Sequence, residues 1–340
     1  FQLFQNRFST QNNVRFIKAG VGGTPSELGM IRFDRDVLRE GERPDIVVIE
    51  FAVNDEGDET KGVCYESLVR KVLKLPWKPA VVLLFSVFAN DWNLQERLRP
   101  VGDLYDLPMV SIRDAVTPQF SLKCGEGRIL SKNQFFYDIF HPNNTGHTIM
   151  ADCLQYLFER CDAAEPARVG TFVEGMTEEQ ILSEKLSGPA VIGADFERIF
   201  LLDKKNRYVG AKIRAGSFTS TDIELQSVEM DGNLTQTPEF PYNWMYDGSR
   251  PQMPGFEMEI TCKSLFLIFK DSGETDVGKA NVFVNDVYCM TADPHKNNWL
   301  HCNAVLLFWE TESRSHKVRI AVTEEDRNKK FTILGFGYTI

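Results

Sequence analysis

Residues 45–55 read DIVVIEFAVND, a nearly continuous apolar run that stops at Asn54 and Asp55. Strands that are buried on both faces, as in a parallel sheet, have this composition because neither face meets water. Residues 80–88, AVVLLFSVF, have the same texture. The first half of the chain is therefore expected to contain a parallel sheet.

Helix-like segments alternate with the strand-like runs in this half. Two shorter apolar runs, at residues 14–20 and 107–112, predict further strands. Segments with helical periodicity lie between the strands, at residues 25–39, 62–75, 93–103 and 145–160. The resulting β-α-β-α order predicts a doubly wound α/β fold with helices on both faces of the sheet, a three-layer α/β/α domain of the flavodoxin-like type.

The helix predicted at residues 145–160 follows a polar loop. Asn144 is the expected N-cap, because an asparagine side chain can accept a hydrogen bond from the first helical turn. The helix carries an apolar stripe through Ile149, Met150, Cys153, Leu154 and Leu157. This face is expected to be its buried one.

The second half has a different texture, with short strands separated by turn-rich segments. In the stretch KVRIAV, the apolar residues Val318, Ile320 and Val322 alternate with polar or small ones, as in a half-exposed strand. Several such strands predict an antiparallel β-sandwich. We place the α/β domain at residues 1–165 and the β-sandwich at 166–340, and expect a short helix at TEEQILSEKL near the linker.

The net charge and the cysteine pattern limit which binding partners and which cellular location are expected. The chain of 340 residues has a formal net charge of -10 and a pI of about 5.2. This charge argues against nucleic acid and against an anionic membrane as partners. No apolar run is long enough to predict a membrane span. The seven cysteines include no CxxC pair, which favours a reducing, cytoplasmic location over a disulfide framework or a structural zinc site.

The stretch YDIFHPNNTGH, residues 137–147, places Asp138 three residues before His141. A carboxylate there can accept the Nδ1–H of the imidazole, which fixes the tautomer and leaves Nε2 as a base. The alternative is a pair of metal ligands, but no third ligand with a recognisable spacing lies nearby. His147, inside the helix, is expected to be a packing or surface residue.

Two further polar signals follow strand-like runs. Asn54 ends the first buried run, and its amide can donate to a developing oxyanion; the alternative is a helix cap or an Asx-turn. The same Val-Asn-Asp occurs in FVNDVY, residues 283–288, where it predicts only a hairpin turn. The tripeptide by itself is therefore weak evidence for an oxyanion site. In KAGVGGTPS, residues 18–26, a glycine-rich turn precedes Pro25. Such a turn exposes backbone N–H groups to a ligand, or simply connects a strand to a helix.

In this order, the three segments resemble the sequence blocks of the SGNH (GDSL-type) hydrolase superfamily, over roughly residues 1–160. Gly23 in AGVGG matches the oxyanion glycine, and Asn54 in VND matches the oxyanion asparagine. Asp138 and His141 in DIFHP match the aspartate and the general-base histidine. The resemblance implies acyl transfer by a serine nucleophile, without a metal or organic cofactor.

The family's first block, Gly-Asp-Ser-Leu or a relative, carries the nucleophile, and nothing before Gly20 resembles it. Ser9 lies in a polar stretch where the family's nucleophile does not sit. We therefore expect the nucleophile to precede Phe1; the other interpretation is a degenerate, inactive relative. In the implied mechanism His141 takes the proton of that serine, and each oxyanion donor contributes on the order of 3 kcal/mol to the transition state.

A β-sandwich after such a domain resembles the jelly-roll carbohydrate-binding modules of bacterial carbohydrate esterases, family 17 in particular. Sugar rings pack on aromatic planes, and amides bond their hydroxyls. Such side chains occur in FPYNWMYDG, in PHKNNWLHCN and, in the first half, in NDWNLQ. The candidate substrate contacts are Trp92, Tyr242, Trp244, Asn298 and Trp299. The alternative for each aromatic ring is packing inside the fold.

The expected function is that of a serine esterase that removes O-acetyl groups from oligosaccharides of mannan or xylan origin. Two alternatives stay open. One is a general short-chain carboxylesterase or lysophospholipase of the same superfamily, and the other is a non-catalytic carbohydrate-binding protein with a degenerate hydrolase domain. The residues before Phe1 would discriminate enzyme from binder. A homo-oligomer is compatible with the sequence.

Overall fold

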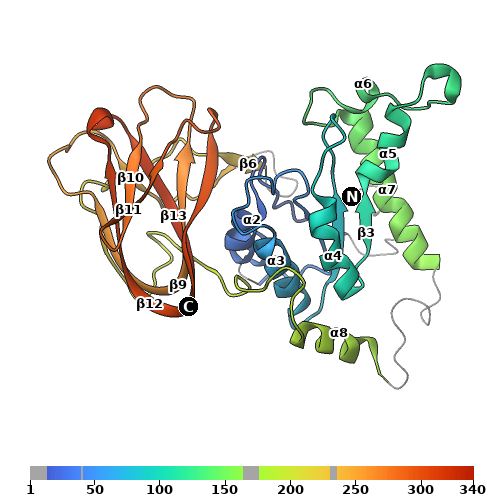
Figure 1. Ribbon diagram of the computed structural model, residues 1–340, viewed down its shortest axis with the longest axis horizontal. Coiled ribbons are helices and arrows are strands. Elements are labelled where there is room, and N and C mark those ends of the chain that lie inside the picture. The colour runs from blue at the N-terminus through green and yellow to red at the C-terminus, as the bar shows by residue number, and fades with distance from the viewer. Residues whose placement is uncertain (1–13, 40, 164–175, 230–235) are drawn as a thin grey trace. The chain divides into compact units, whose positions relative to one another are not determined.

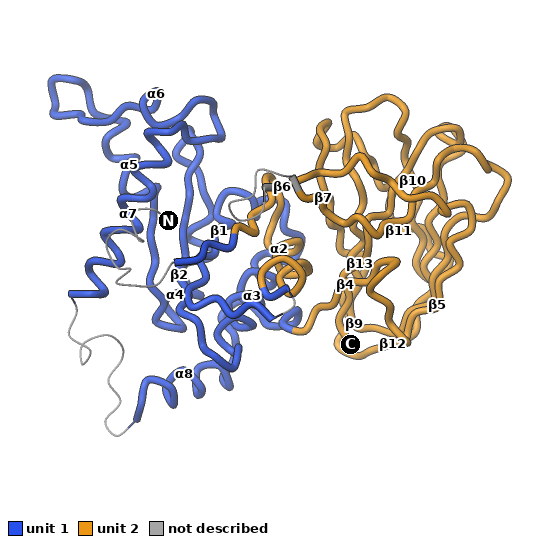
Figure 2. Tube along the Cα trace, turned by 180° about the vertical axis from the view of Figure 1, so that it is seen from behind, with its two compact units in different colours: residues 1–17, 38–197 blue, residues 18–37, 198–340 orange. Residues whose placement is uncertain are grey.

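The computed structural model describes residues 14–39, 41–163, 176–229 and 236–340. Internal contacts divide the chain into two compact units, shown in Figure 2: residues 1–17 with 38–197, and residues 18–37 with 198–340. The short segment 18–37 is thus counted with the C-terminal unit, although it precedes the parallel strands in the chain. Among the described residues, no helix has both the length and the apolar character needed to cross a bilayer.

The first unit is built on a three-stranded parallel sheet in the order β1 (Ile46–Glu50), β2 (Ala80–Phe85), β3 (Met109–Ser111). Two pairs of helices pack together: α3 (Val63–Leu73) with α4 (Gln95–Tyr105), and α5 (Ile112–Phe120) with α7 (Asn144–Ala163). Figure 1 shows α4 and α7 on opposite sides of β3. The predicted α/β/α fold of the first half is confirmed.

Helix α7 packs as its apolar stripe predicts. A core of buried residues that includes Leu84, Val110 and Phe135 is covered by the stripe: Ile149, Met150, Cys153, Leu154 and Leu157. The predicted cap is wrong by one residue. The Asn143 side chain accepts a hydrogen bond of 3.0 Å from the Gly146 N–H, and Asn144 is already the first helical residue. The cap must precede the helix, because its side chain accepts a hydrogen bond from an N–H group two or three residues further along the chain.

The strand predicted at residues 14–20 is absent, because the chain there forms neither helix nor strand. An apolar run becomes a strand only when a neighbouring strand pairs with its backbone groups. From Lys18 onward the chain is counted with the second unit rather than with the parallel sheet. The helix predicted at 25–39 does form, as α2 (Ser26–Phe33) followed by the π-helical turn η1 (Asp34–Leu38).

The second unit is an antiparallel β-sandwich in which two long strands, β9 (Phe256–Asp271) and β12 (His301–Val322), belong to both layers. In one layer the beginning of β9 pairs with β5 (Ala211–Arg214), and the end of β12 pairs with β10 (Ala280–Val284). Strand β10 in turn pairs with β11 (Val287–Ala292). In the other layer β9 pairs with β13 (Phe331–Thr339), which also pairs with β4 (Phe200–Leu202) and β8 (Trp244–Tyr246). The pairing of β9 with β12 shifts register between Leu306 and Phe308 and again between Trp309 and Arg314, and such irregularities allow long strands to bend.

Local sequence patterns in the sandwich behave as predicted. Val318 and Ile320 are fully buried in the core that joins both layers. Asn285 and Asp286 connect β10 to β11 with φ angles of 53° and 62°, the conformation that two-residue hairpin turns require. The short helix near the linker is present as α8 (Glu178–Ser187), which belongs to the first unit, and a small hairpin pairs β6 (Ser227–Glu229) with β7 (Gln236–Pro238).

Helix α2 completes the second unit by packing on the sandwich near β4 and β13. Gly337 of β13 makes this close approach possible, because a Cβ atom there would lie only 2.5 Å from Cδ1 of Ile31. All residues of α2 and of β13 are buried. The sandwich therefore holds a segment from the N-terminal part of the chain as an integral part of its structure.

In the first unit, Glu66 of α3 ties down the segment at 191–193. This fully buried carboxylate accepts hydrogen bonds from the N–H groups of Val191, Ile192 and Gly193 and from the Tyr105 hydroxyl, at 2.5–3.0 Å.

Glu66→Ala leaves these donors without their acceptor, and we expect a loss of about 3 kcal/mol in the free energy of unfolding, measured with urea. Glu66→Gln retains an acceptor and should lose less; equal stability of E66A and wild type would contradict the prediction.

Candidate active site

Asp138 and His141 lie together in the loop between α6 (Lys132–Phe135) and α7. The Asp138 Oδ1 atom accepts hydrogen bonds from the N–H groups of Phe140, at 2.7 Å, and His141, at 2.6 Å. The Nδ1 atom of His141 lies 2.9 Å from Oδ2 and 3.1 Å from Oδ1 of the same carboxylate. One carboxylate thus closes the turn and orients the imidazole, and Nε2 is the ring nitrogen that faces away from it.

The charge state of Asp138 follows from these contacts. The hydrogen bond from the His141 ring, together with the two backbone N–H donors, lowers the pKa of Asp138 below its usual value. The carboxylate is therefore an anion at neutral pH, the state that favours Nδ1–H on the imidazole. Across the described ranges 14–39, 41–163, 176–229 and 236–340, no three His, Cys, Asp or Glu side chains are grouped to hold a metal ion.

Aromatic rings surround His141. The Tyr137 ring stacks on the imidazole with 5.5 Å between centroids and 10° between planes, and Phe140 meets it edge-on at 6.2 Å. Phe140 contacts Phe88 at 5.2 Å, and Phe88 stacks on Trp92 at 5.6 Å. Trp92 therefore belongs to the aromatic cluster next to the His141 loop, and its role in substrate binding stays a prediction. Tyr137 was not predicted; its only sequence signal is an aromatic residue four positions before a candidate base.

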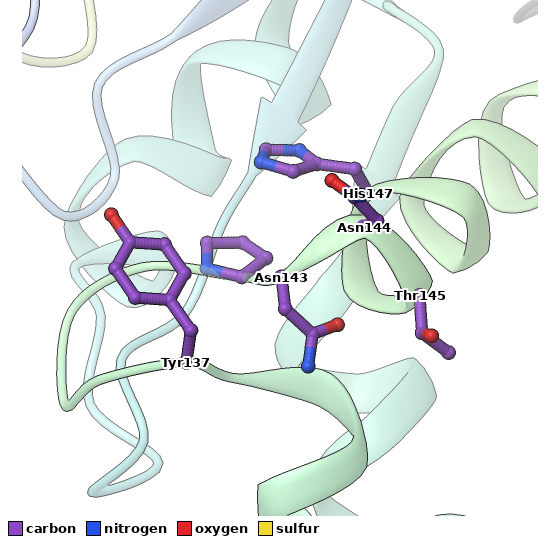
Figure 3. A pocket seen from close by; sticks show the side chains of 6 residues that line it. Tyr137, Asn143, Asn144, Thr145 and His147 are labelled. Atoms are coloured by element: carbon purple, nitrogen blue, oxygen red, sulfur yellow. The ribbon is translucent and has the colours of Figure 1, made fainter.

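A pocket of about 410 Å³ lies beside this loop. Figure 3 shows Tyr137, Asn143 and His147 around it. Its lining consists of Tyr137, Pro142, Asn143, Asn144, Thr145 and His147. The wall is rich in polar groups and carries one exposed aromatic ring, a combination suited to a polar ligand with an apolar face. His147, expected as a packing or surface residue, is an exposed part of this wall.

Asn54 is half-buried in the turn after β1, where its N–H donates to the Phe51 carbonyl at 3.1 Å. Glu50, the last residue of β1, holds this turn in place. Its Oε1 atom accepts hydrogen bonds from the N–H of Ala52, at 3.0 Å, and from the N–H of Ser86, which follows β2, at 3.3 Å. One carboxylate thus joins the carboxyl ends of two neighbouring strands, the edge where doubly wound sheets bind ligands.

Removal from water raises the pKa of Glu50 to about 7, although both N–H donors act in the opposite direction. Because the folded-state pKa exceeds the unfolded one, the folded state binds this proton more tightly. The resulting stabilisation is complete below about pH 4.5 and is lost progressively as the pH rises to about 7. We expect wild type to lose on the order of 1–2 kcal/mol relative to Glu50→Gln between pH 5 and pH 8. Urea denaturation of both proteins at several pH values checks this; parallel stability curves would rule it out.

Gly23 is counted with the second unit, whereas Asn54, Asp138 and His141 are counted with the first. The φ angle of Gly23 is +71°, a conformation that favours glycine. A Cβ atom at this position would lie 2.8 Å from Cζ2 of Trp299, and the Gly23 carbonyl lies 2.8 Å from Nε2 of His301. Trp299, which is 46% exposed, therefore packs directly against the candidate oxyanion glycine.

The other candidate sugar contacts differ in their accessibility. Tyr242 is 44% exposed, with Nζ of Lys205 5.3 Å from its ring centroid, and Asn298 is exposed. Trp244 is 5% exposed and packs edge-on against Phe256 in the sandwich core. The expectation of a sugar contact at Trp244 is wrong, because a ring enclosed by core residues presents no face to a ligand.

No family model and no curated protein matches the sequence. Two solved structures resemble it over nearly its whole length. The first is a two-domain esterase active on acetylated mannans, co-crystallised with mannopentaose; the match has 23% identity and a TM-score of 0.74, and covers 99% of this chain and 83% of that chain. The chain has the fold of a two-domain esterase.

The second structure is again a two-domain esterase active on acetylated mannans. Its match has 22% identity and a TM-score of 0.69, and covers 94% of this chain and 79% of that chain. Both matches include the α/β domain and the β-sandwich, the two architectures that the sequence predicted in this order. At these identities the likeness concerns the fold, so the chemistry has to be argued from the side chains of this chain.

Proposed function

We propose that this protein is a carbohydrate esterase that hydrolyses O-acetyl esters on mannan-derived oligosaccharides. The observation that carries the proposal is the pairing of His141 Nδ1 with the Asp138 carboxylate at 2.9 Å. This pair occurs on a fold that an esterase active on acetylated mannans shares over 99% of the chain. The assignment to the SGNH hydrolases, and to a Ser-His-Asp mechanism, belongs to the proposal.

In the proposed reaction, Nε2 of His141 takes the proton of a serine hydroxyl as its oxygen attacks the acetyl carbonyl. The tetrahedral intermediate collapses, the bond to the sugar oxygen breaks, and the imidazolium gives its proton to that oxygen. Water then attacks the acetyl-enzyme by the same steps and releases acetate. Asp138 stabilises the imidazolium and holds the ring in the tautomer that keeps Nε2 basic. We assign no residue of this sequence as the nucleophile.

The oxyanion of each tetrahedral intermediate requires hydrogen-bond donors. We propose the Gly23 N–H and the Asn54 side-chain amide for this role. Gly23 supports it with a left-handed turn conformation at an exposed position, where the residue has no side chain of its own beside its N–H. Asn54 supports it with its position in the turn that follows the parallel strand β1, a turn held by Glu50.

The proposal is tested by incubating the full-length protein with acetylated oligosaccharides derived from mannan and from xylan, and following acetate loss by mass spectrometry. Preferred deacetylation of the mannan series is the expected result. Faster turnover of lysophospholipids or simple short-chain esters would favour a general esterase. Binding of the oligosaccharides without any loss of acetate would favour a carbohydrate-binding protein and overturn the proposal.

A further inference from the structure

The turn that contains Gly23 has little structure of its own. Thr24 bonds back to the Val21 carbonyl through its hydroxyl, at 2.8 Å, and through a long N–H contact of 3.4 Å. Between them stand Gly22 and Gly23, both exposed. Two consecutive glycines have great backbone freedom. A precise direction of the Gly23 N–H therefore has to come from contacts outside the turn.

Gln226 of the β-sandwich unit provides one such contact. It is only 8% exposed, and both ends of its amide are engaged. Its Nε2 donates to the Gly22 carbonyl at 3.0 Å, and its Oε1 accepts from the Cys302 N–H at 3.0 Å. The Gly22 carbonyl and the Gly23 N–H belong to one planar trans peptide and point in opposite directions. By holding this carbonyl, Gln226 sets the direction of the Gly23 N–H.

His301, the first residue of β12, holds the next carbonyl. It is 4% exposed, and its Nε2 lies 2.8 Å from the Gly23 oxygen. The Asn297 Nδ2 group, which can only donate, lies 3.3 Å from Nδ1, so Nε2 carries the proton and donates to Gly23. Burial lowers the pKa of His301, against the effect of the Gly23 carbonyl, and so favours the neutral ring. The Trp299 ring packs on His301 at 4.5 Å.

The fully buried carboxylate of Asp271, at the end of β9, anchors this arrangement. Its Oδ2 accepts from the Asn297 N–H at 3.0 Å and from the Asn303 side-chain amide at 2.8 Å. The positions of Asn297 and His301 are thus tied to the sandwich core. In the described part of the chain, by contrast, the Gly23 N–H donates to no acceptor. The turn is held on its carbonyl side and leaves this donor available.

We propose that Gln226 and His301 are positioning residues for acetyl ester hydrolysis, which hold the carbonyls of Gly22 and Gly23 so that the Gly23 N–H is aimed at the oxyanion. This inference rests on the proposed function and extends it. It gives the β-sandwich a part in transition-state stabilisation, in addition to any contact with sugar. Preorganised donors act in the transition state rather than in the bound ground state, so loss of their alignment lowers kcat and leaves KM nearly unchanged.

Two substitutions remove one donor each. Gln226→Glu keeps the acceptor for the Cys302 N–H and loses the donor to Gly22. His301→Leu loses the donor to Gly23, whereas His301→Gln can place an amide N–H near the former Nε2. We expect Q226E and H301L to lower kcat on acetylated mannan oligosaccharides about 10- to 100-fold, with KM within about twofold. H301Q should recover most of the loss.

His316→Leu is the matched control for H301L. His316 is also a buried histidine of β12, 5% exposed, but it packs on Phe308 and contacts Asn285 instead of the glycine turn. H316L should lose stability without losing kcat per folded molecule. Hydrogen exchange of the peptide that contains Gly22 and Gly23 gives a second readout, and should be faster in Q226E and H301L than in wild type and H316L.

The possible results separate the two proposals. Wild-type protein without acetylesterase activity overturns the proposed function, and the inference with it. Active wild type with unchanged kcat in Q226E and H301L overturns the inference alone, as does an equal loss of kcat in H316L. If H301L does not fold, Q226E decides: a 10- to 100-fold lower kcat with KM nearly unchanged supports the inference, and an unchanged kcat overturns it.

Discussion

His141→Ala is expected to lower kcat for acetyl ester hydrolysis by about 10⁴-fold, with the fold intact. Alanine removes the group that takes the serine proton in the first step and returns it to the leaving sugar oxygen. The His141 side chain is 60% exposed, so its loss leaves no cavity in a core and little change in stability is expected. Initial rates on a nitrophenyl acetate and on acetylated mannan oligosaccharides measure the effect, with thermal unfolding as the check on the fold.

Two further measurements make this result specific. His147→Ala removes the imidazole of the neighbouring pocket wall, which does not bond Asp138, and should keep kcat within about threefold of wild type. Added imidazole should partly restore H141A, because the exposed position leaves room for a free base to enter. Retained turnover in H141A would remove this residue as the proposed base.

Asp138→Asn is expected to lower kcat by about 10²- to 10³-fold. The asparagine Oδ1 can still accept the N–H groups of Phe140 and His141, so the turn persists. Its NH₂ group replaces the oxygen that lies 2.9 Å from His141 Nδ1, and two donors cannot face each other there. The imidazole proton then moves to Nε2, and the ring cannot accept the serine proton. Because both side chains are partly exposed, water moderates the effect, which is why we expect less than for H141A.

The control for this variant is Asp152→Asn, which makes the same charge change at an exposed position of α7. It should leave both kcat and KM near their wild-type values. A kcat for D138N within threefold of wild type would show that Asp138 only closes the turn. A backbone effect would instead appear as a lower unfolding temperature in D138N.

Sequence patterns predicted the fold well wherever a local period carries the information. The runs that became β1 and β2 form parallel strands, β2 is buried except at its first residue, and the stripe along α7 lies on a hydrophobic core. The expectation of burial on both faces is wrong for β1, where Ile46 and Val48 are exposed. The run at residues 14–20 shows the limit of this reasoning, since an apolar run does not specify its pairing partner. Trp244 shows a second limit. Its turn-rich surroundings suggested an exposed loop, whereas β8 pairs with β13 and turns the ring into the core.

The sequence by itself indicated the pairing of Asp138 with His141, because only three peptide bonds separate the two residues and a tight turn there brings their side chains together. Only the tertiary structure decided how the Gly23 turn is held. Gln226 and His301 are separated from Gly22 and Gly23 by 204 and 278 positions. No local pattern encodes such contacts, because they form only once the packing of α2 and the sandwich has brought these segments together.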